Sequence, residues 1–294
     1  MREDLTNIND PKRFHGVIGA RVAEYISNAD GRFYLRDLYD YCNAHEDRAK
    51  AAVRQAIHKA KTDKKIESSG GLAGCYRRIE NDFGFTDLTI LGNEPPMDIK
   101  LPLGLDRHVE LYPKDLFVYA GTPNAGKSAF MLETVRLNMN RYNCFYFSTE
   151  MSGRNCSMRI SKHTETPLSE WKIQFSENFT NYTDIIQPDD LNFVDYLEAE
   201  DGEFFKIPSL LSGIQRKLRG GLAFVALQKN PGNDNAIGGT QTRAKPAVFC
   251  TIEDSIFKIV KAKNWNTINP NGFTAQFKIY NGINISRVRG WEAP

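Results

Sequence analysis

Residues Gly121 to Ser128 read Gly-Thr-Pro-Asn-Ala-Gly-Lys-Ser, which is the pattern G-x-x-x-x-G-K-[ST]. An apolar run at 116–120 precedes this segment, and a stretch with helical spacing at 127–140 follows it. Between a strand and a helix, such glycines let backbone N–H groups converge on phosphates, and the helix N-terminus adds positive potential. The segment therefore predicts a P-loop for the phosphates of ATP, made of Gly121, Thr122, Pro123, Asn124, Ala125, Gly126, Lys127 and Ser128.

The chemistry of a P-loop assigns roles to its last two residues and requires a carboxylate elsewhere. Lys127 is expected to contact the β- and γ-phosphates, and the Ser128 hydroxyl to bind Mg²⁺. Asp195 ends the buried apolar run 191–194, some 70 residues downstream, where a second Mg²⁺ ligand is expected. The predicted cofactors are therefore ATP and Mg²⁺, with Ser128 and Asp195 as the metal ligands.

From Leu101 onward, strand-like and helix-like segments alternate. Short apolar runs of the buried parallel-strand type lie at 116–120, 143–148, 191–194 and 222–227. Helical stretches such as 127–140 and 207–219 lie between them. This alternation predicts an α/β domain over 101–294 with a mainly parallel sheet. Residues 81–100, with the breaker Gly92-Asn-Glu-Pro-Pro96, are expected to be a linker.

Residues 1–80 are predicted to form a separate small α+β unit. Apolar residues at 17–26 have helical spacing, a short extended segment leads into a second helix near Leu38, and a third helix spans about 46–61. Two strand-like segments, 65–67 and 75–79, flank the Gly-rich stretch 68–74, which indicates a hairpin. Three helices followed by a hairpin resemble the winged-helix family of helix-turn-helix domains.

The net charge of +2 is unevenly distributed. Residues 48–78 hold nine Lys and Arg against two Asp and Glu, which is the balance expected where nucleic acid binds. In a winged helix, the third helix would enter the major groove while the wing contacts the backbone. The alternatives are a solvated basic face and a surface for protein contact. The predicted DNA-binding residues are Lys50, Arg54, His58 and Lys61 on the helix, with Arg77 and Arg78 on the wing.

The segment Cys144-Phe-Tyr-Phe-Ser-Thr-Glu-Met-Ser152 is an apolar run that ends in Glu150. It resembles the Ser-Leu-Glu-Met segment of DnaB-type replicative helicases, whose motor domains are RecA-like. Four more stretches agree with that family in order and spacing: Gly104–Asp106, Val194–Leu197, Val225–Asn230 and Ile259–Asn264. The resemblance covers about 85–286. It implies that Glu150 activates water, that Gln228 contacts the γ-phosphate, and that subunits form a ring, such as a hexamer.

The final family motif normally reads Lys-x-Arg, with an arginine finger that reaches a neighbouring subunit's nucleotide. Here the pair is Lys261 and Lys263, and a lysine lacks the planar fork of arginine. The resemblance also implies DNA-contacting loops after the Asp195 strand and after the Gln228 strand. The first loop, 199–203, is acidic and would repel phosphate. The second, 230–246, carries Arg243 and Lys245 and is the predicted contact with single strands.

Bulk composition places the chain among ordinary globular proteins, with 41% hydrophobic and 25% charged residues. No apolar run is long enough to span a bilayer, and the first ten residues lack the apolar core of a signal peptide. Five cysteines without paired spacing fit a reducing compartment. The sequence therefore predicts a cytoplasmic protein with no membrane partner.

The leading interpretation is an ATP-hydrolysing, DnaB-like DNA helicase or translocase of replication, with Glu150, Lys127, Gln228 and Lys263 as its catalytic residues. One alternative is a RecA/RadA-like recombination ATPase that coats single strands. The other is a DNA-bound nucleotide switch or helicase loader with slow turnover, for which the missing arginine finger would be the reason.

Overall fold

The computed structural model describes residues 10–29, 31–71, 73–79, 87–92, 94–177, 179, 181–198 and 203–294. The chain divides into two units, Met1–Gly92 and Asn93–Pro294, and each unit is described here by itself. Among the described residues, no helix is both long and apolar enough to cross a membrane.

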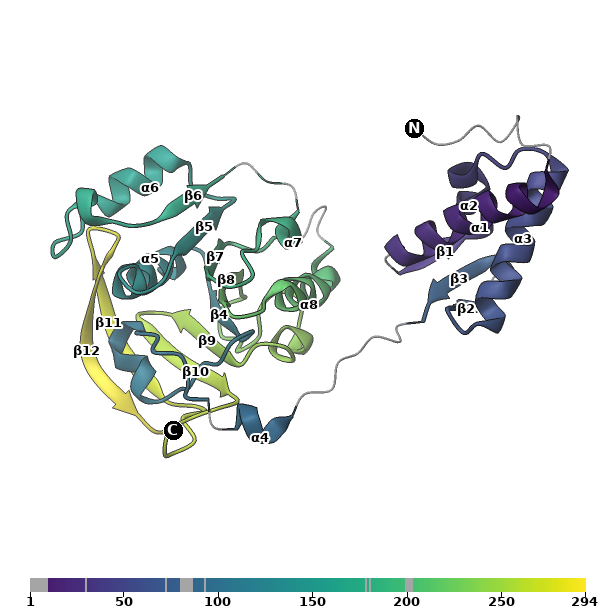
Figure 1. The fold of residues 1–294 in the computed structure, drawn as a ribbon. Coiled ribbons are helices and arrows are strands. Elements are labelled where there is room, and N and C mark those ends of the chain that lie inside the picture. Colours follow the sequence, from purple (N-terminus) through teal and green to yellow (C-terminus); the bar gives the residue numbers. More distant parts are fainter. Residues whose placement is uncertain are drawn as a thin grey trace. The chain divides into compact units, whose positions relative to one another are not determined.

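The N-terminal unit alternates helices with a small antiparallel sheet (Figure 1). Its helices and strands are α1 (Pro11–Asn28), β1 (Arg32–Tyr34), α2 (Leu35–Cys42), α3 (Asp47–Thr62), β2 (Ile66–Ser68), β3 (Cys75–Arg78) and α4 (Leu88–Leu91). The strand order is β1-β3-β2, with both pairs antiparallel. The three expected helices and the hairpin are therefore present in the expected order.

Local sequence explains where these helices begin and how they pack. The Asp10 side chain accepts a hydrogen bond from Lys12 N, and Pro11 occupies the first turn of α1, where its missing N–H costs nothing. Ile18 and Val22 of α1 are buried with Val53 and Ile57 of α3 in one apolar core. The facing sides of α1 and α3 therefore supply much of the small core of this unit.

The C-terminal unit contains the remaining elements, most of them on a nine-stranded sheet. Its strands are β4 (Leu116–Gly121), β5 (Cys144–Ser148), β6 (Gln174–Ser176), β7 (Leu191–Asp195), β8 (Leu222–Gln228), β9 (Val248–Glu253), β10 (Ile256–Ala262), β11 (Thr274–Tyr280) and β12 (Asn284–Glu292). Its helices are α5 (Lys127–Asn138), α6 (Gly153–Ile160), α7 (Tyr182–Ile185) and α8 (Ile207–Lys217), with short 3₁₀ turns η2 (Pro102–Arg107), η3 (Leu168–Glu170), η5 (Phe204–Lys206) and η6 (Thr240–Arg243).

The sheet order is β12-β11-β10-β9-β4-β8-β7-β5-β6. The six strands from β9 to β6 run parallel, and β10, β11 and β12 extend the β9 edge in antiparallel fashion. The carboxyl ends of the parallel strands therefore lie along one edge of the sheet, named here the carboxyl edge, and their amino ends along the opposite edge, named the amino edge. The mainly parallel sheet predicted from the alternating pattern is confirmed.

Helices cover both faces of this sheet, with α5 on one side and α8 on the other (Figure 1). Strand alternation sends Phe117 and Tyr119 of β4 to the α5 face, and Val118 to the α8 face. All six residues of β4 are buried, as expected for a central parallel strand covered on both faces. This arrangement fixes β4, which leads into the predicted P-loop, at the centre of the molecule's largest core.

The predicted linker 81–100 includes residues that pack in the C-terminal unit. Residues 80–86 and 93 lie outside the described part of the chain. Met97 N donates to Leu111 O, and Lys100 N donates to Asn138 Oδ1. Ile99 is buried beside Leu101 in the large core. The end of the predicted linker, after Pro95 and Pro96, therefore packs into the core of the α/β unit.

Candidate functional site

The predicted P-loop lies at the carboxyl edge, between the end of β4 and the start of α5. Asn124 and Gly126 have φ values of 59° and 103°, so the loop turns through the left-handed region twice. A Cβ on Gly126 would lie 2.3 Å from Ile279 Cδ1 of β11, and one on Gly121 would lie 3.0 Å from Lys127 Cγ. Both glycines of the motif are therefore required by close packing, and Gly126 also by its backbone conformation.

Lys127 is held over this loop as a buried cation. Its side chain is among the few buried charged groups, with the residue 8% exposed. Its Nζ donates to Gly121 O at 3.2 Å and to Thr122 O at 3.1 Å. Burial lowers its pKa, while the nearby carboxylates of Glu150 and Asp195 raise it. Among the described residues, the hydrogen-bond partners of the ammonium are thus two main-chain carbonyls at the start of the loop.

Asp195, the last residue of β7, is 1% exposed. The Tyr146 hydroxyl of β5 donates to its Oδ2 at 2.5 Å. Burial raises the pKa of Asp195, while hydrogen bonds from Tyr146 and Ser128 lower it. Its other oxygen, Oδ1, is buried and has no hydrogen-bond partner in the described chain. A buried carboxylate oxygen without a donor, beside a serine hydroxyl, is the environment that a hard cation such as Mg²⁺ fits.

Tyr146 was not predicted as a site residue. It precedes Ser148 by two residues, and Ser148 is the register partner of Asp195 on β7. Because residues two apart on a strand share a face, the phenol lies on the same face as Ser148, near the end of β7. The spacing between Tyr146 and Ser148 is visible in the sequence, but it places the phenol near Asp195 only when β5 and β7 are known to be neighbours.

Glu150 follows β5 and is exposed to solvent. The adjacent Thr149 N donates to Asp195 O at 3.1 Å, which ties the end of β5 to the end of β7. The charge of the Glu150 carboxylate raises the pKa of both Lys127 and Asp195. The structure thus brings together Lys127, Ser128, Asp195 and Glu150, all of which the sequence had assigned to one site.

Gln228 ends β8 and is the register partner of Gly121, the first residue of the P-loop. The next residue, Lys229, is 2% exposed, and its Nζ lies 2.5 Å from Glu253 Oε2 at the end of β9. Glu253 also accepts from Gly232 N, and its pKa is lowered, first by the hydrogen bond from Lys229. This ion pair, which the sequence had not predicted, bridges the two strands on either side of β4 beside the P-loop.

Lys263 lies at the amino edge, away from the P-loop of its own chain. Lys263 N donates to Ala247 O, just before β9, whereas Gly121 is paired with Ile252 near the end of that strand. Five residues of strand correspond to about 16 Å. Lys263 Nζ donates to Lys245 O at 2.9 Å, and the neighbouring Lys261 Nζ donates to Arg243 O. The predicted finger lysine therefore cannot reach the nucleotide site of its own chain.

The second predicted DNA-binding loop, 230–246, is folded onto the C-terminal unit. Ile237 N donates to Gln228 O at 2.8 Å, Thr242 is buried, and η6 packs against α8. Arg243 is half-buried and Lys245 is exposed. Of the first loop, 199–203, residues 199–202 lie outside the described part of the chain, and Glu203 forms an ion pair with Lys206.

The predicted DNA-binding residues of the N-terminal unit divide between two sides. Arg54 donates to Tyr39 of α2, and Lys61 to Ser68 of β2, while Lys50 lies half-buried on α3. Arg77 is paired with Glu67 of the same hairpin. These residues are therefore grouped beside α2 and the hairpin.

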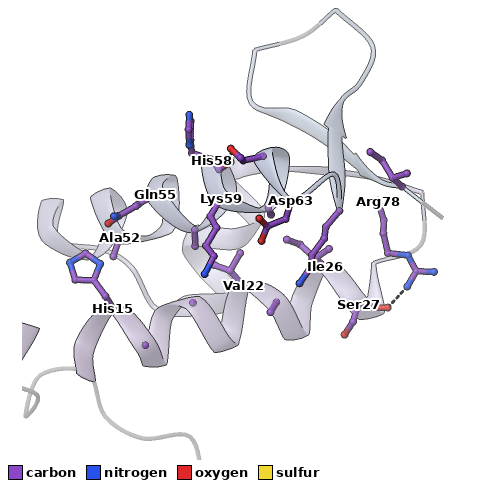
Figure 2. Close-up of a pocket in the computed structure, with 18 of the residues that line it drawn as sticks. His15, Val22, Ile26, Ser27, Ala52, Gln55, His58, Lys59, Asp63 and Arg78 are labelled. Carbon is purple, nitrogen blue, oxygen red and sulfur yellow. Dashed lines mark hydrogen bonds between the residues drawn. The ribbon is translucent and has the colours of Figure 1, made fainter. Parts of the chain in front are cut away.

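His58 and Arg78 line a groove between α1 and α3, which has a volume of about 1200 Å³ (Figure 2). Arg78 Nη1 donates to Ser27 O at the end of α1 at 2.6 Å. Arg77 and Arg78 point to opposite faces of β3 because neighbouring residues alternate along a strand. The sequence had placed both on one surface, and the structure separates them.

No protein-family model and no curated protein matches the sequence. Among solved structures, the ATPase domain of a DnaB-type helicase matches with a TM-score of 0.50 and 14% identity, over 69% of this chain and 95% of that chain. This chain has a RecA-like fold. The RadB recombinase matches with a TM-score of 0.43 and 15% identity, over 60% of this chain and 92% of that chain.

The RecA-like unit carries its P-loop, Asp195, Glu150 and Gln228 on four different strands that end at one edge. Ligands of open α/β sheets bind outside the carboxyl ends of the strands, so the candidate site has the expected location. No group of three or more His, Cys, Asp or Glu side chains in the described residues could hold a metal ion.

Proposed function

We propose that the RecA-like unit binds ATP and hydrolyses it with Mg²⁺. The observation that carries this proposal is the buried pair at the carboxyl edge, the Lys127 cation and the Asp195 carboxylate with its unpartnered oxygen. P-loop N–H groups and Lys127 would bind the phosphates, and Ser128 and Asp195 would hold the Mg²⁺. The metal would neutralise charge on the phosphate oxygens.

Glu150 and Gln228 are the residues that would act on the attacking water and the γ-phosphate. Glu150 is exposed, so its carboxylate has access to water, and it lies near Lys127, so it is close to the phosphates. As a general base it would accept the proton of the attacking water. Gln228 is half-buried beside Gly121 and can donate its amide N–H groups to a γ-phosphate oxygen.

The specific role we propose is a DnaB-like DNA helicase or translocase that works as a ring, with a hexamer as the expected form. The ordered motifs that resemble DnaB-type helicases support this role. The place of Lys263 supports it as well, since a residue at the amino edge could serve only the nucleotide site of another subunit. Arg243 and Lys245 would contact the single strand.

A slow, DNA-bound nucleotide switch or helicase loader is the second candidate. It is favoured by one observation, the lysine at position 263 where the resemblance implies an arginine finger. A compact ammonium neutralises charge but cannot bind two oxygens in a fixed fork, so turnover would be lower.

The deciding experiment measures ATP turnover with and without single-stranded DNA, together with strand displacement on a forked duplex. A motor should show DNA-stimulated multiple turnover and should displace the strand. Glu150→Gln is the control: it should bind ATP but lose about 10²–10⁴-fold in turnover. Turnover without displacement would favour the switch, and normal hydrolysis by Glu150→Gln would remove Glu150 from its proposed role.

We further propose that the N-terminal unit is a winged helix that binds duplex DNA independently of ATP. The supporting observation is the group of Lys50, Arg54 and Lys61 on α3 beside the basic hairpin. Neutral replacements at Lys50 and Arg54 should weaken duplex binding and reduce its salt slope by about one unit per lost phosphate contact. The same changes at Lys59 and Lys65, in the α1–α3 groove, are the matched control. If only the groove variants lost DNA binding, the assignment of the face would be wrong.

A further inference from the structure

Two large aromatic side chains lie exposed at the start of α8, where the fold does not require them. Phe204 and Phe205, in η5, are 45% and 73% exposed. The core contacts of this region come instead from Ile207, Leu211 and Ile214, which are buried against the sheet. Exposed neighbouring apolar side chains of this size are characteristic of binding surfaces.

The second loop, 230–246, touches the backbone of this aromatic pair. A Cβ on Gly238 would lie 3.0 Å from Phe204 O and 3.5 Å from Ile207 Cβ, so the loop packs directly against η5. From Gly238 the loop continues into η6, which packs along α8, and then reaches Arg243 and Lys245. The second loop therefore runs along α8 from the backbone of Phe204 to Arg243 and Lys245, whose carbonyls accept from Lys261 and Lys263.

The charge around the rings indicates which part of a nucleic acid they would contact. Glu203 precedes the pair and forms an ion pair with Lys206, so no excess positive charge lies at the rings themselves. Phosphates would therefore be attracted only weakly to this position, whereas an aromatic face binds a base by stacking, which requires no charge. Arg243 and Lys245 form no ion pair among the described residues, so they are available to the phosphates.

We propose that Phe204 and Phe205 form a base-stacking platform for single-stranded nucleic acid, and that the second loop carries Arg243 and Lys245 further along the same strand. The platform rests on the proposed DNA function and specifies which part of the strand the motor unit contacts. It selects single strands over duplex because the bases of a duplex are already stacked on one another. The cations supply the salt-dependent part of the affinity, and the rings supply the part that depends on bases.

The test uses the full chain and fluorescence anisotropy with two labelled probes, an oligodeoxythymidylate and an abasic oligonucleotide of equal length. The parent should bind the thymidylate more tightly than the abasic probe. Phe204→Ala/Phe205→Ala should weaken thymidylate binding about ten- to hundredfold, with an unchanged salt slope, and should remove the preference over the abasic probe. Phe205→Trp should retain binding, whereas Phe205→Leu, which keeps apolar surface without a ring face, should not.

Ile268→Ala is the matched control, because Ile268 is 69% exposed and lies in a different loop. Thermal unfolding of each variant checks that the fold is intact. If the parent binds the thymidylate and the double alanine variant binds it equally well, the platform is overturned while the DNA function stands. If the parent does not bind either probe, the proposed DNA function fails and the platform fails with it. A double variant that changes only the oligomeric state would also overturn the platform and make the rings a subunit contact.

Discussion

The two edges of the parallel sheet differ in how far their charged residues are exposed to solvent. At the carboxyl edge, Lys127, Asp195 and Lys229 are all less than a tenth exposed, and one oxygen of Asp195 has no partner in the described chain. At the amino edge, Lys261 and Lys263 are more open to solvent and rest on main-chain carbonyls of 243–245. Lys127 and Asp195, proposed for the site within the chain, are therefore fixed by burial, whereas Lys263, proposed for a neighbouring subunit, remains accessible.

The largest effect on ATP turnover is expected at the carboxyl edge, where the charged residues are most buried. Lys127→Ala removes the buried cation that the carbonyls of Gly121 and Thr122 hold at the P-loop. We expect steady-state ATP turnover to fall on the order of 10²–10³-fold, as for the loss of other preorganised donors at a reacting oxyanion. Turnover within a few-fold of the parent would show that the buried lysine is structural and would remove the P-loop assignment.

The ion pair between buried Lys229 and partly exposed Glu253, which has no proposed role in hydrolysis, tests what burial of a charge contributes to stability. Glu253→Gln leaves the Lys229 ammonium buried without its counter-charge, so the C-terminal unit should lose about 3 kcal/mol of stability in urea unfolding. Lys229→Met combined with Glu253→Gln should recover most of this loss. Because the pKa of Glu253 is lowered in the fold, the parent should keep the stabilisation above the usual carboxyl pKa and lose it as the pH falls through the lowered value. No difference between the single and double variants would contradict the prediction.

Tyr146→Phe tests how much one hydrogen bond to the buried Asp195 contributes to Mg²⁺ binding. The variant keeps the buried ring but leaves Asp195 Oδ2 without its donor. We expect the Mg²⁺ concentration for half-maximal turnover to rise about 10-fold or more, as for other partners of metal ligands. Since the Tyr146 bond lowers the pKa of Asp195, its loss should raise that pKa and make the defect greater at lower pH. A Mg²⁺ requirement equal to the parent's at every pH would exclude Asp195 as the ligand.

The smallest effect on ATP turnover is expected at the amino edge, where Lys263 would act on the nucleotide site of a neighbouring subunit. Lys263→Ala should lower turnover about tenfold without weakening ATP binding, and Lys263→Arg should raise turnover. Mixing Lys263→Ala with Glu150→Gln subunits should restore part of the activity, because some interfaces then pair an intact Lys263 with an intact Glu150. Lys217→Ala, an exposed lysine of α8, is the control. Parent-like turnover by Lys263→Ala would favour the slow switch over the ring motor.

Several parts of this architecture could be predicted because their signals are local. The P-loop follows from its spacing, and the strands β4, β5, β7 and β8 follow from short apolar runs. Asp195 is proposed as a Mg²⁺ ligand because it ends such a run, whereas the proposed role of Glu150 comes from the resemblance to DnaB-type helicases. The order of helices and hairpin in the N-terminal unit likewise follows from periodicity and turn residues.

Other parts depend on which segments become neighbours, and local sequence does not contain that information. Tyr146 contacts Asp195 only because β5 lies beside β7, and Lys229 reaches Glu253 only because β8 and β9 flank β4. The edge strand β12 is mostly exposed, so it lacks the apolar run by which the central strands are recognised. The separation of Arg77 from Arg78 could have been predicted, since it follows from strand alternation alone.

Because Ile279 of β11 packs against Gly126 of the P-loop, the proposed nucleotide site is complete only after β11 has been synthesised. Ribosomes complete the P-loop long before they reach β11, so a growing chain has every residue of the loop while the face of Gly126 that Ile279 covers is still open. Nucleotide binding should therefore begin late in synthesis. Stalled nascent chains ending at Lys263 should bind a fluorescent ATP analogue far more weakly than chains ending beyond β12, and equal binding would show that the hairpin is dispensable for the loop.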